Sequence, residues 1–218
     1  MRIHQHVNPL NKKYLVVPTM PQWSKVYAEP FLPLHLDLGS ASGRFLLQMA
    51  QKNKDWNYLG LEIREPLVER ANQWKDELGL ANLYFFHGQA HIVLQPLLES
   101  LPIGVLQFVS INFPDPWFKR RHHKRRLVTP QLVQTLATYL QPHGKVFIQT
   151  DVEELFENIC GLFADNTCFQ VVDELVEQNP FGILTERENS VIRLGRYIYR
   201  SIFERKAEKP CEKRMNNN

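Results

Sequence analysis

The sequence of 218 residues has few cysteines and no long apolar run, and each absence excludes a class of protein. The three cysteines, Cys160, Cys168 and Cys211, are odd in number and lack CxxC spacing, so we expect reduced thiols instead of a disulfide framework or a zinc site. The longest stretch without Lys, Arg, Asp or Glu, 78–98, has 21 residues, several of them polar, and so falls short of the roughly 20 apolar residues that span a bilayer. The chain also begins without the apolar segment of a secretory signal, which predicts a soluble cytoplasmic protein with no membrane partner.

Neither sign of charge is in large excess, but the basic charge is concentrated. The chain has 26 Lys and Arg against 23 Asp and Glu, a formal net charge of +3. Segment 119–126, with the sequence KRRHHKRR, holds six of these basic residues. Without it the chain has 20 basic and 23 acidic side chains and a net charge of −3. This segment therefore favours a polyanionic partner, and the alternative is an ordinary solvated charge run.

The remaining pattern predicts one α/β domain between two tails. Residues 1–33 contain five of the 14 prolines and show no sustained period, so we interpret them as an N-terminal arm; 206–218 form a polar tail. Within 34–205, apolar runs of strand length occur at 34–38, 58–63, 83–87, 105–112 and 145–150, and helical patterns occur at 44–54, 65–78, 131–140 and after Asp151. This alternation predicts a Rossmann-like, doubly wound, mostly parallel sheet with helices on both faces. Later strands are expected near 169–175 and 196–203, and the second has the alternation of an antiparallel or edge strand.

The ends of the first three predicted strands carry the residues of a nucleotide-type site. Asp37 precedes a turn of small residues from Gly39 to Gly43, and in doubly wound sheets ligands bind at such strand ends. The turn is neither a P-loop nor a complete GxGxxG, so by itself it does not identify a ligand. Glu62 ends the second strand, where a carboxylate can accept hydrogen bonds from ribose hydroxyls; a solvated loop glutamate is the alternative. Gln89 follows the third strand, where its amide could contact an adenine ring.

The fourth strand leads into the unusual string FPDPWFKRRHHKRRL. Asp115 stands between two prolines, with Phe113 and Trp117 outside them. Each proline fixes its own φ and restricts the residue before it, so Asp115 is a rigidly held acceptor. The neighbouring rings could stack on a base that has left its helix. Because the basic segment follows directly, the combination predicts a nucleic-acid ligand.

Together these motifs resemble the bacterial tRNA guanine-N7 methyltransferases, a class I family that uses S-adenosylmethionine. LDLGSASGRFL, LGLEIRE, FPDPWFKRRHHKRRL, QTDVEEL and TERE followed by GRYIYRSIFER occur in the family's order over about 34–205. The resemblance implies a seven-stranded class I fold, S-adenosylmethionine as methyl donor and a guanine in the tRNA variable loop as acceptor. It implies no metal. A monomer and a homodimer both remain open.

The resemblance also assigns roles to individual residues. The cofactor site would comprise Asp37, Gly39, Gly43, Glu62, Gln89 and Asp115, with Asp115 as the principal active-site carboxylate; the substrate residues would be Lys119, Asp151, Thr185, Glu186, Arg187 and Glu188; and the tRNA backbone would meet Arg120, Arg121, Lys124, Arg125 and Arg126. The sequence departs from the family's usual residue at Asp37, Ala41, Gln89 and Arg187, where glutamate, glycine, an acid or asparagine, and an aromatic are common.

Two other functions remain as alternatives. A methyltransferase acting on an exocyclic amine of another base would be expected to carry a (D/N)PP(Y/F)-like loop, which differs from PDPWFK. A non-catalytic tRNA-binding protein could retain the fold without the chemistry. His87 and His91 have an i,i+4 spacing, but they flank a predicted strand end and no third ligand accompanies them, so a metal site is disfavoured.

Overall fold

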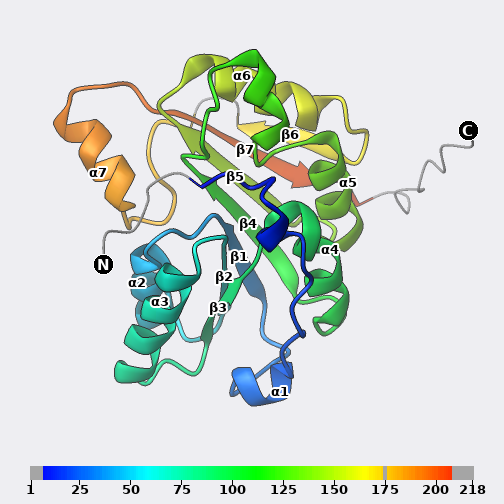
Figure 1. The fold of residues 1–218 in the computed structure, drawn as a ribbon, viewed down its shortest axis with the longest axis vertical. Helices are drawn as coiled ribbons and strands as arrows, with labels where there is room; N and C mark the ends of the chain where they lie inside the picture. The colour runs from blue at the N-terminus through cyan, green and yellow to red at the C-terminus, as the bar shows by residue number, and fades with distance from the viewer. Residues whose placement is uncertain (1–6, 174–175, 208–218) are drawn as a thin grey trace, which may run out of the picture.

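The computed structural model of the chain describes residues 7–173 and 176–207, which build a seven-stranded sheet of order β3-β2-β1-β4-β5-β7-β6 (Figure 1). The strands are β1 (Leu34–Leu38), β2 (Asn57–Glu62), β3 (Leu83–His87), β4 (Leu106–Asn112), β5 (Lys145–Thr150), β6 (Phe169–Asp173) and β7 (Tyr199–Arg205). β1 to β5 run parallel, and β7 is antiparallel to both of its neighbours. The predicted doubly wound sheet is confirmed, and its antiparallel strand lies inside the sheet instead of at its edge.

Helices alternate with the parallel strands, and all of those between β1 and β6 except the one after β3 were predicted. They are α1 (Trp23–Val26), α2 (Arg44–Lys52), α3 (Glu65–Glu77), α4 (Ala90–Ser100), α5 (Pro130–Tyr139), α6 (Glu153–Ala164) and α7 (Glu186–Arg193), with short 3-10 turns η1 (Lys12–Tyr14) and η2 (Arg120–Arg125). Figure 1 shows α2 and α3 on one side of the sheet and α4 and α5 on the other. The sixth helix begins after Asp151, as predicted, and its N-cap is Val152.

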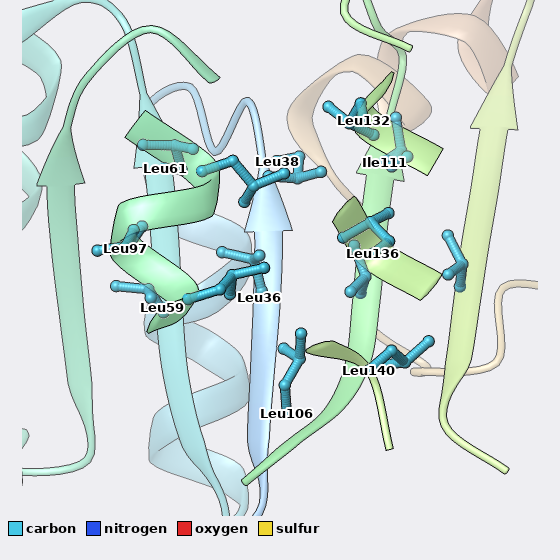
Figure 2. Packing of buried hydrophobic residues seen from close by; sticks show 14 of the residues in the cluster. Leu36, Leu38, Leu59, Leu61, Leu97, Leu106, Ile111, Leu132, Leu136 and Leu140 are labelled. Carbon is cyan, nitrogen blue, oxygen red and sulfur yellow. The ribbon is translucent and has the colours of Figure 1, made fainter. Parts of the chain in front are cut away.

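The alternation of side chains along each strand places a hydrophobic cluster on both faces of the sheet. Leu36 and Leu38 of β1 pack with Leu97 of α4 and Leu136 of α5 on one face (Figure 2). On the other face, Tyr58 and Phe85 join the apolar residues of α2 and α3. Burial of one such side chain contributes about 1.5–3 kcal/mol. With both faces covered, β1 and β2 are buried along their whole length.

Part of the proline-rich N-terminal arm packs into the larger cluster. Trp23 is buried and its Nε1 donates a hydrogen bond to Ser100 Oγ at 3.0 Å. Tyr27 stacks on Trp23 and donates its hydroxyl to the carbonyl oxygen of Tyr58 at 3.1 Å. These two rings therefore attach the arm to the domain on the side of α4.

The cysteines depart from the expectation of three reduced thiols. Cys168 takes part in a disulfide, and Cys211 lies outside the described residues. Of the helices in the described part of the chain, none has the length and apolar character needed to cross a membrane.

Candidate active site

A pocket of about 800 Å³ opens at the carboxyl ends of β1, β2, β4 and β5. Its wall brings together residues that the sequence analysis selected from six separate segments, including Gly39, Glu62, Gln89, Asp115, Asp151 and Arg187. The volume is in the range of sites that enclose small organic ligands. Asp37, Lys119 and Glu188 are not among the lining residues.

Asp37 lies in the sheet next to the pocket and is 3% exposed. Its Oδ1 accepts hydrogen bonds from Ser110 Oγ at 2.6 Å and from Asn112 Nδ2 at 2.8 Å. Burial raises the pKa of Asp37 to about 6, because desolvation outweighs these two hydrogen bonds and the charge of Glu62 adds to the shift. His35 Nε2 lies 2.9 Å from Ser110 Oγ, and burial lowers the pKa of His35 to about 3. Since the hydroxyl proton goes to Asp37, neutral His35 donates to Ser110.

The turn after β1 uses left-handed backbone at three positions. Gly39, Ala41 and Gly43 have φ values of +83°, +50° and +77°. A Cβ atom on Gly43 would lie 2.7 Å from the ring of Phe85 and 2.8 Å from Ala71, so only glycine lets α2 start this close to its neighbours. The turn directs the N–H of Ala41 to Glu62 Oε2, 2.9 Å away.

Glu62 is the last residue of β2, its side chain is 3% exposed, and both of its carboxylate oxygens accept hydrogen bonds. Besides Ala41, it accepts from Arg64 three times: the backbone N–H at 3.0 Å and Nε at 2.8 Å donate to Oε1, and Nη2 at 3.2 Å donates to Oε2. Burial would lower the pKa of Arg64, but the hydrogen bond to Glu62 and the charges of Glu62 and Asp115 raise it. Arg64 is a site residue that the sequence analysis missed, although it stands inside the LGLEIRE motif.

Gln89 reaches the pocket from the start of α4. Its Oε1 accepts the N–H of Ile92 at 3.1 Å, so the residue caps the helix as well as lining the pocket. The nearby histidines each contact a backbone carbonyl: His87 Nε2 lies 3.1 Å from the oxygen of Ile63, and His91 Nε2 lies 3.0 Å from that of Arg126. Across residues 7–173 and 176–207, no group of three or more His, Cys, Asp or Glu side chains could hold a metal ion.

The loop after β4 holds Asp115 at the pocket wall, between two residues with left-handed backbone. Phe113 and Trp117 have φ values of +49° and +44°, which large side chains seldom adopt and which cluster at functional loops. The guanidinium of Arg125 lies over the Trp117 ring, 4.9 Å from its centroid, and the His122 ring meets the same indole edge-on at 5.9 Å. The aromatic loop and the basic segment thus form one continuous surface.

The basic segment contains both exposed side chains and one buried arginine. Lys119, Arg120, Arg121 and Lys124 are exposed along η2, whereas Arg126 is 7% exposed. Arg126 donates from Nε to the carbonyl oxygen of Pro116 at 3.0 Å and from Nη2 to Glu154 Oε1 at 3.2 Å. The pKa of His122 is lowered, first by desolvation and then by the neighbouring cations. Arg126 is therefore placed differently from the other residues predicted to meet the tRNA backbone.

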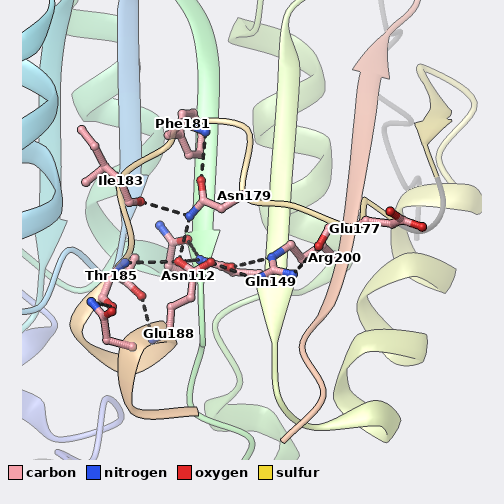
Figure 3. Close-up of polar contacts among 10 residues, drawn as sticks. Asn112, Gln149, Glu177, Asn179, Phe181, Ile183, Thr185, Glu188 and Arg200 are labelled. Carbon is pink, nitrogen blue, oxygen red and sulfur yellow. Dashed lines mark hydrogen bonds and ion pairs between the residues drawn. The ribbon is translucent and has the colours of Figure 1, made fainter. Parts of the chain in front are cut away.

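The first turn of α7 contacts three separate parts of the domain. Thr185 caps the helix and forms a capping box with Glu188, a pattern that the letters TERE already contain. Glu186 accepts a hydrogen bond from Ser42 and pairs with Arg44 at 3.6 Å, both in or next to the turn after β1. Arg187 Nη2 donates to Asp151 Oδ2 at 2.6 Å at the pocket wall. Glu188 is fully buried and pairs with Arg200 at 2.9 Å (Figure 3).

Comparison with known proteins identifies relatives over most of the chain. Residues 32–201 match a family described as "Putative methyltransferase". A protein of Trichormus variabilis named tRNA (guanine-N(7)-)-methyltransferase is 53% identical over 207 residues, which cover 94% of this chain and 96% of the relative. A protein of the same name from Synechocystis sp. is 46% identical, with coverage of 94% and 98%.

Solved structures with little sequence identity share the fold. The 16S rRNA methyltransferase KamB superposes with a TM-score of 0.60 at 13% identity, covering 87% of this chain and 95% of its own. The aminoglycoside resistance methyltransferase NpmB1 gives a TM-score of 0.56 at 16% identity, with coverage of 81% and 89%. At these low identities the superpositions support the Rossmann-like fold and nothing further.

Proposed function

This chain belongs to the tRNA (guanine-N7-)-methyltransferase family, and we propose that it transfers the methyl group of S-adenosylmethionine to N7 of a guanine in the tRNA variable loop, with Asp115 at the reacting centre. The observation that carries the proposal is the position of Asp115. Its loop forms the wall of the pocket that also contains Glu62, and the same loop continues into the basic segment. One strand connection thus joins a small-ligand pocket to a surface for a polyanion.

The residues of the pocket fit S-adenosylmethionine. Glu62 supplies a buried carboxylate for hydroxyl donors, and apolar side chains such as Leu38 and Ile63 line the same wall. The Glu62 oxygens accept hydrogen bonds from Ala41 and Arg64. A ribose that uses Glu62 would therefore take over hydrogen bonds now made by the Arg64 side chain. When bound, S-adenosylmethionine supplies an electrophilic sulfonium methyl group.

The chemistry requires positioning more than proton transfer. Guanine N7 has an in-plane lone pair and no proton, so its attack on the methyl carbon needs no general base. The new N–C bond forms as the C–S bond breaks, and positive charge moves to the purine. The Asp115 carboxylate can accept hydrogen bonds from guanine N1–H and the exocyclic amine and stabilise that charge. Adenine lacks this pair of donors, which would explain specificity for guanine.

The exposed part of the basic segment is proposed to hold the tRNA backbone. Lys119, Arg120, Arg121 and Lys124 project from η2 next to the loop of Asp115. Binding through such cations releases counterions and weakens as salt rises. Arg187 and Asp151 in the pocket wall, with Thr185 and Glu186 next to them in the chain, would then meet the target nucleotide. A tRNA substrate is consistent with a cytoplasmic reaction.

Transfer of a labelled methyl group tests the proposal. The protein is incubated with labelled S-adenosylmethionine and unmodified tRNA, beside Asp115→Asn and the exposed control Asp165→Asn. We expect the wild type and Asp165→Asn to label tRNA at similar rates and Asp115→Asn to be at least ten-fold slower. Binding of tRNA without any label would favour the non-catalytic alternative, and equal rates for all three proteins would remove Asp115 from the reacting centre.

A further inference from the structure

A row of polar side chains, all buried except the half-buried Asn112, crosses the sheet from Asp37 to Glu188. Asn112 Nδ2 donates to Asp37 Oδ1 at 2.8 Å, and Gln149 Nε2 donates to Asn112 Oδ1 at 2.8 Å. Arg200 Nε donates to Gln149 Oε1 at 3.2 Å, and its Nη2 pairs with Glu188 Oε1 at 2.9 Å. Figure 3 shows the part of this row from Asn112 to Glu188. We name these five residues the polar row.

The register of the sheet produces the row. Asn112 of β4 is the partner of Gln149 in β5, and Gln149 is the partner of Arg200 in β7. Partners in neighbouring strands point to the same face, so three strands contribute one side chain each at the same level. Gln149 has no exposed surface and Arg200 is 8% exposed, so water does not compete for these hydrogen bonds.

The order of donors and acceptors allows only one orientation for the two side-chain amides of the polar row. Each amide must direct its nitrogen toward the Asp37 end and its oxygen toward the arginine, because a flipped amide would place two acceptors or two donors together. Asp37 can only accept when charged, and the guanidinium of Arg200 can only donate. A shift at one end therefore breaks a buried hydrogen bond, which makes the row a rigid spacer between its two ends.

Glu188 is held at the far end by groups other than a ligand. Arg200 donates to its Oε1, and its Oε2 accepts from Asn179 Nδ2 at 2.7 Å, from the N–H of Thr185 at 3.2 Å and from Gln149 Nε2 at 3.3 Å. The hydroxyl of Thr185 in turn accepts the N–H of Glu188 at 3.1 Å. Glu188 is 0% exposed and is absent from the pocket wall. To face a base it would have to leave the buried Arg200 without its partner.

We propose that Glu188 is a positioning residue for the methyl-transfer reaction and that the polar row fixes the first turn of α7 relative to the cofactor side of the pocket. Arg187 of that turn lines the pocket and is bound to Asp151, and Glu186 beside it is bound by Ser42 of the turn after β1. In this proposal, the buried contacts of Glu188 fix the positions of Glu186 and Arg187. The inference deepens the proposed function and rests on it, because it presumes that this turn meets the target guanine.

Two arginines of β7 provide a matched test of the row. Arg200 belongs to it, whereas Arg205 donates from Nε to the carbonyl oxygen of Ala137 at 2.7 Å, far from the pocket along the strand. We expect Arg200→Met to lower kcat at least ten-fold, because small misalignments of reacting groups are costly in rate. Dissociation constants for S-adenosylhomocysteine and for tRNA, each measured alone, should stay within three-fold of wild type. Arg205→Met should keep the wild-type kcat at a comparable loss of thermal stability.

Conservative variants keep this test decisive if Arg200→Met does not fold. Arg200→Lys retains the positive charge facing Glu188 but loses the planar guanidinium. We expect its kcat to lie between those of wild type and Arg200→Met. If Arg200→Met does not fold, we expect the kcat of Arg200→Lys to be about three- to ten-fold below that of wild type. A folded Arg200 variant with wild-type kcat would overturn the role of the row. So would a variant whose only defect is weaker tRNA binding, since that result indicates direct contact.

A substrate analogue distinguishes positioning by Glu188 from contact with the base. Inosine lacks the exocyclic amine of guanine, and tRNA with inosine at the target position can be assembled by ligation. We expect Glu188→Gln to lower kcat for both tRNAs and to leave the guanine-to-inosine ratio of kcat/KM within three-fold of the wild-type ratio. A ratio that collapses only in Glu188→Gln would overturn the inference. If the wild type makes no 7-methylguanine, the proposed function fails instead.

Discussion

Arg126 lies behind the loop that carries Asp115, and its Nε donates to the carbonyl oxygen of Pro116 at 3.0 Å. The same guanidinium donates from Nη1 to Asn158 Oδ1 at 3.3 Å and from Nη2 to Glu154, so it joins the loop to α6. The last residue of a run of cations thus acts within the domain, whereas Arg120 and Arg121 face solvent. The segment that reverses the net charge of the chain has a structural end and a solvent-exposed end.

Substitution should separate these two ends. We expect Arg126→Ala to lower the free energy of unfolding by about 2–3 kcal/mol, because several charge-assisted hydrogen bonds are lost, with no change in the salt dependence of tRNA binding. Arg121→Ala should change stability by less than about 0.5 kcal/mol and reduce the slope of log affinity against log salt by about 0.7–0.9. Urea denaturation and tRNA titrations at several salt concentrations measure both. Equal salt slopes for the two variants would contradict the distinction.

The buried charge of Asp37 should lower the free energy of unfolding at neutral pH. Its pKa lies above the ordinary value of 3.8, at about 6, so the native state binds the proton more tightly than the unfolded state. The free energy of unfolding therefore falls by about 3 kcal/mol as pH rises from about 4 to about 6. Asp37→Asn keeps an acceptor for Ser110 and Asn112 and removes the buried charge.

We accordingly expect Asp37→Asn to be more stable than wild type by about 1–3 kcal/mol at pH 7, with the difference vanishing near pH 4. Affinity for S-adenosylhomocysteine should fall in the same variant if the charge contributes to the cofactor site. Denaturation across this pH range and calorimetric titration measure the two effects, with the exposed Asp165→Asn as control. A variant that is less stable at pH 7 would contradict the effect assigned to burial.

The rate of the chemical step should be independent of pH near neutrality. N7 needs no general base, the pKa of Asp37 lies at about 6, and His35, with a pKa of about 3, stays neutral. In single-turnover experiments with both substrates saturating, we expect less than a two-fold change between about pH 6.5 and 8.5. A rate that rises ten-fold with a midpoint near 7 would indicate an essential base and contradict the role given to Asp115.

The two glycines that bound the first turn should respond differently to alanine. Both have left-handed backbone, which costs about 1 kcal/mol on substitution. A Cβ atom on Gly39 meets nothing within 4 Å, whereas one on Gly43 lies 2.7 Å from Phe85. We expect Gly43→Ala to lose about 1–3 kcal/mol more than Gly39→Ala because of overpacking. Urea denaturation of both variants checks this, and equal losses would show that packing at Gly43 is loose.

Periodicity predicted most of the sheet but not every helix. The strands at 34–38, 83–87 and 145–150 coincide with β1, β3 and β5 because buried parallel strands read as continuous apolar runs. Helix α4 was not predicted, since Pro96 stands inside it and a proline in a helix interior normally breaks the helix. Helix α7 was not predicted either, because it is mostly polar and buries only Glu188 and Val191, which gives no extended apolar face.

The site was predictable where a residue follows a strand and was not where its role depends on distant partners. Glu62 and Asp115 were located because strand ends in a doubly wound sheet converge on one edge. The burial of Asp37 depends on Ser110 and Asn112, more than 70 positions away. Nothing in the letters KRRHHKRR distinguishes Arg126 from Arg125, because the inward turn of one guanidinium is decided by α6 and the loop of Pro116.

Mapping the methyl group on the product tRNA tests the central claim most directly. Unmodified tRNA is reacted with S-adenosylmethionine and the wild-type protein, and the modified nucleotide is identified by mass spectrometry and located by cleavage at 7-methylguanine. We predict 7-methylguanine at one guanine of the variable loop, and loss of that product with Asp115→Asn. A methyl group on an exocyclic amine, on another base or outside the variable loop would contradict the account.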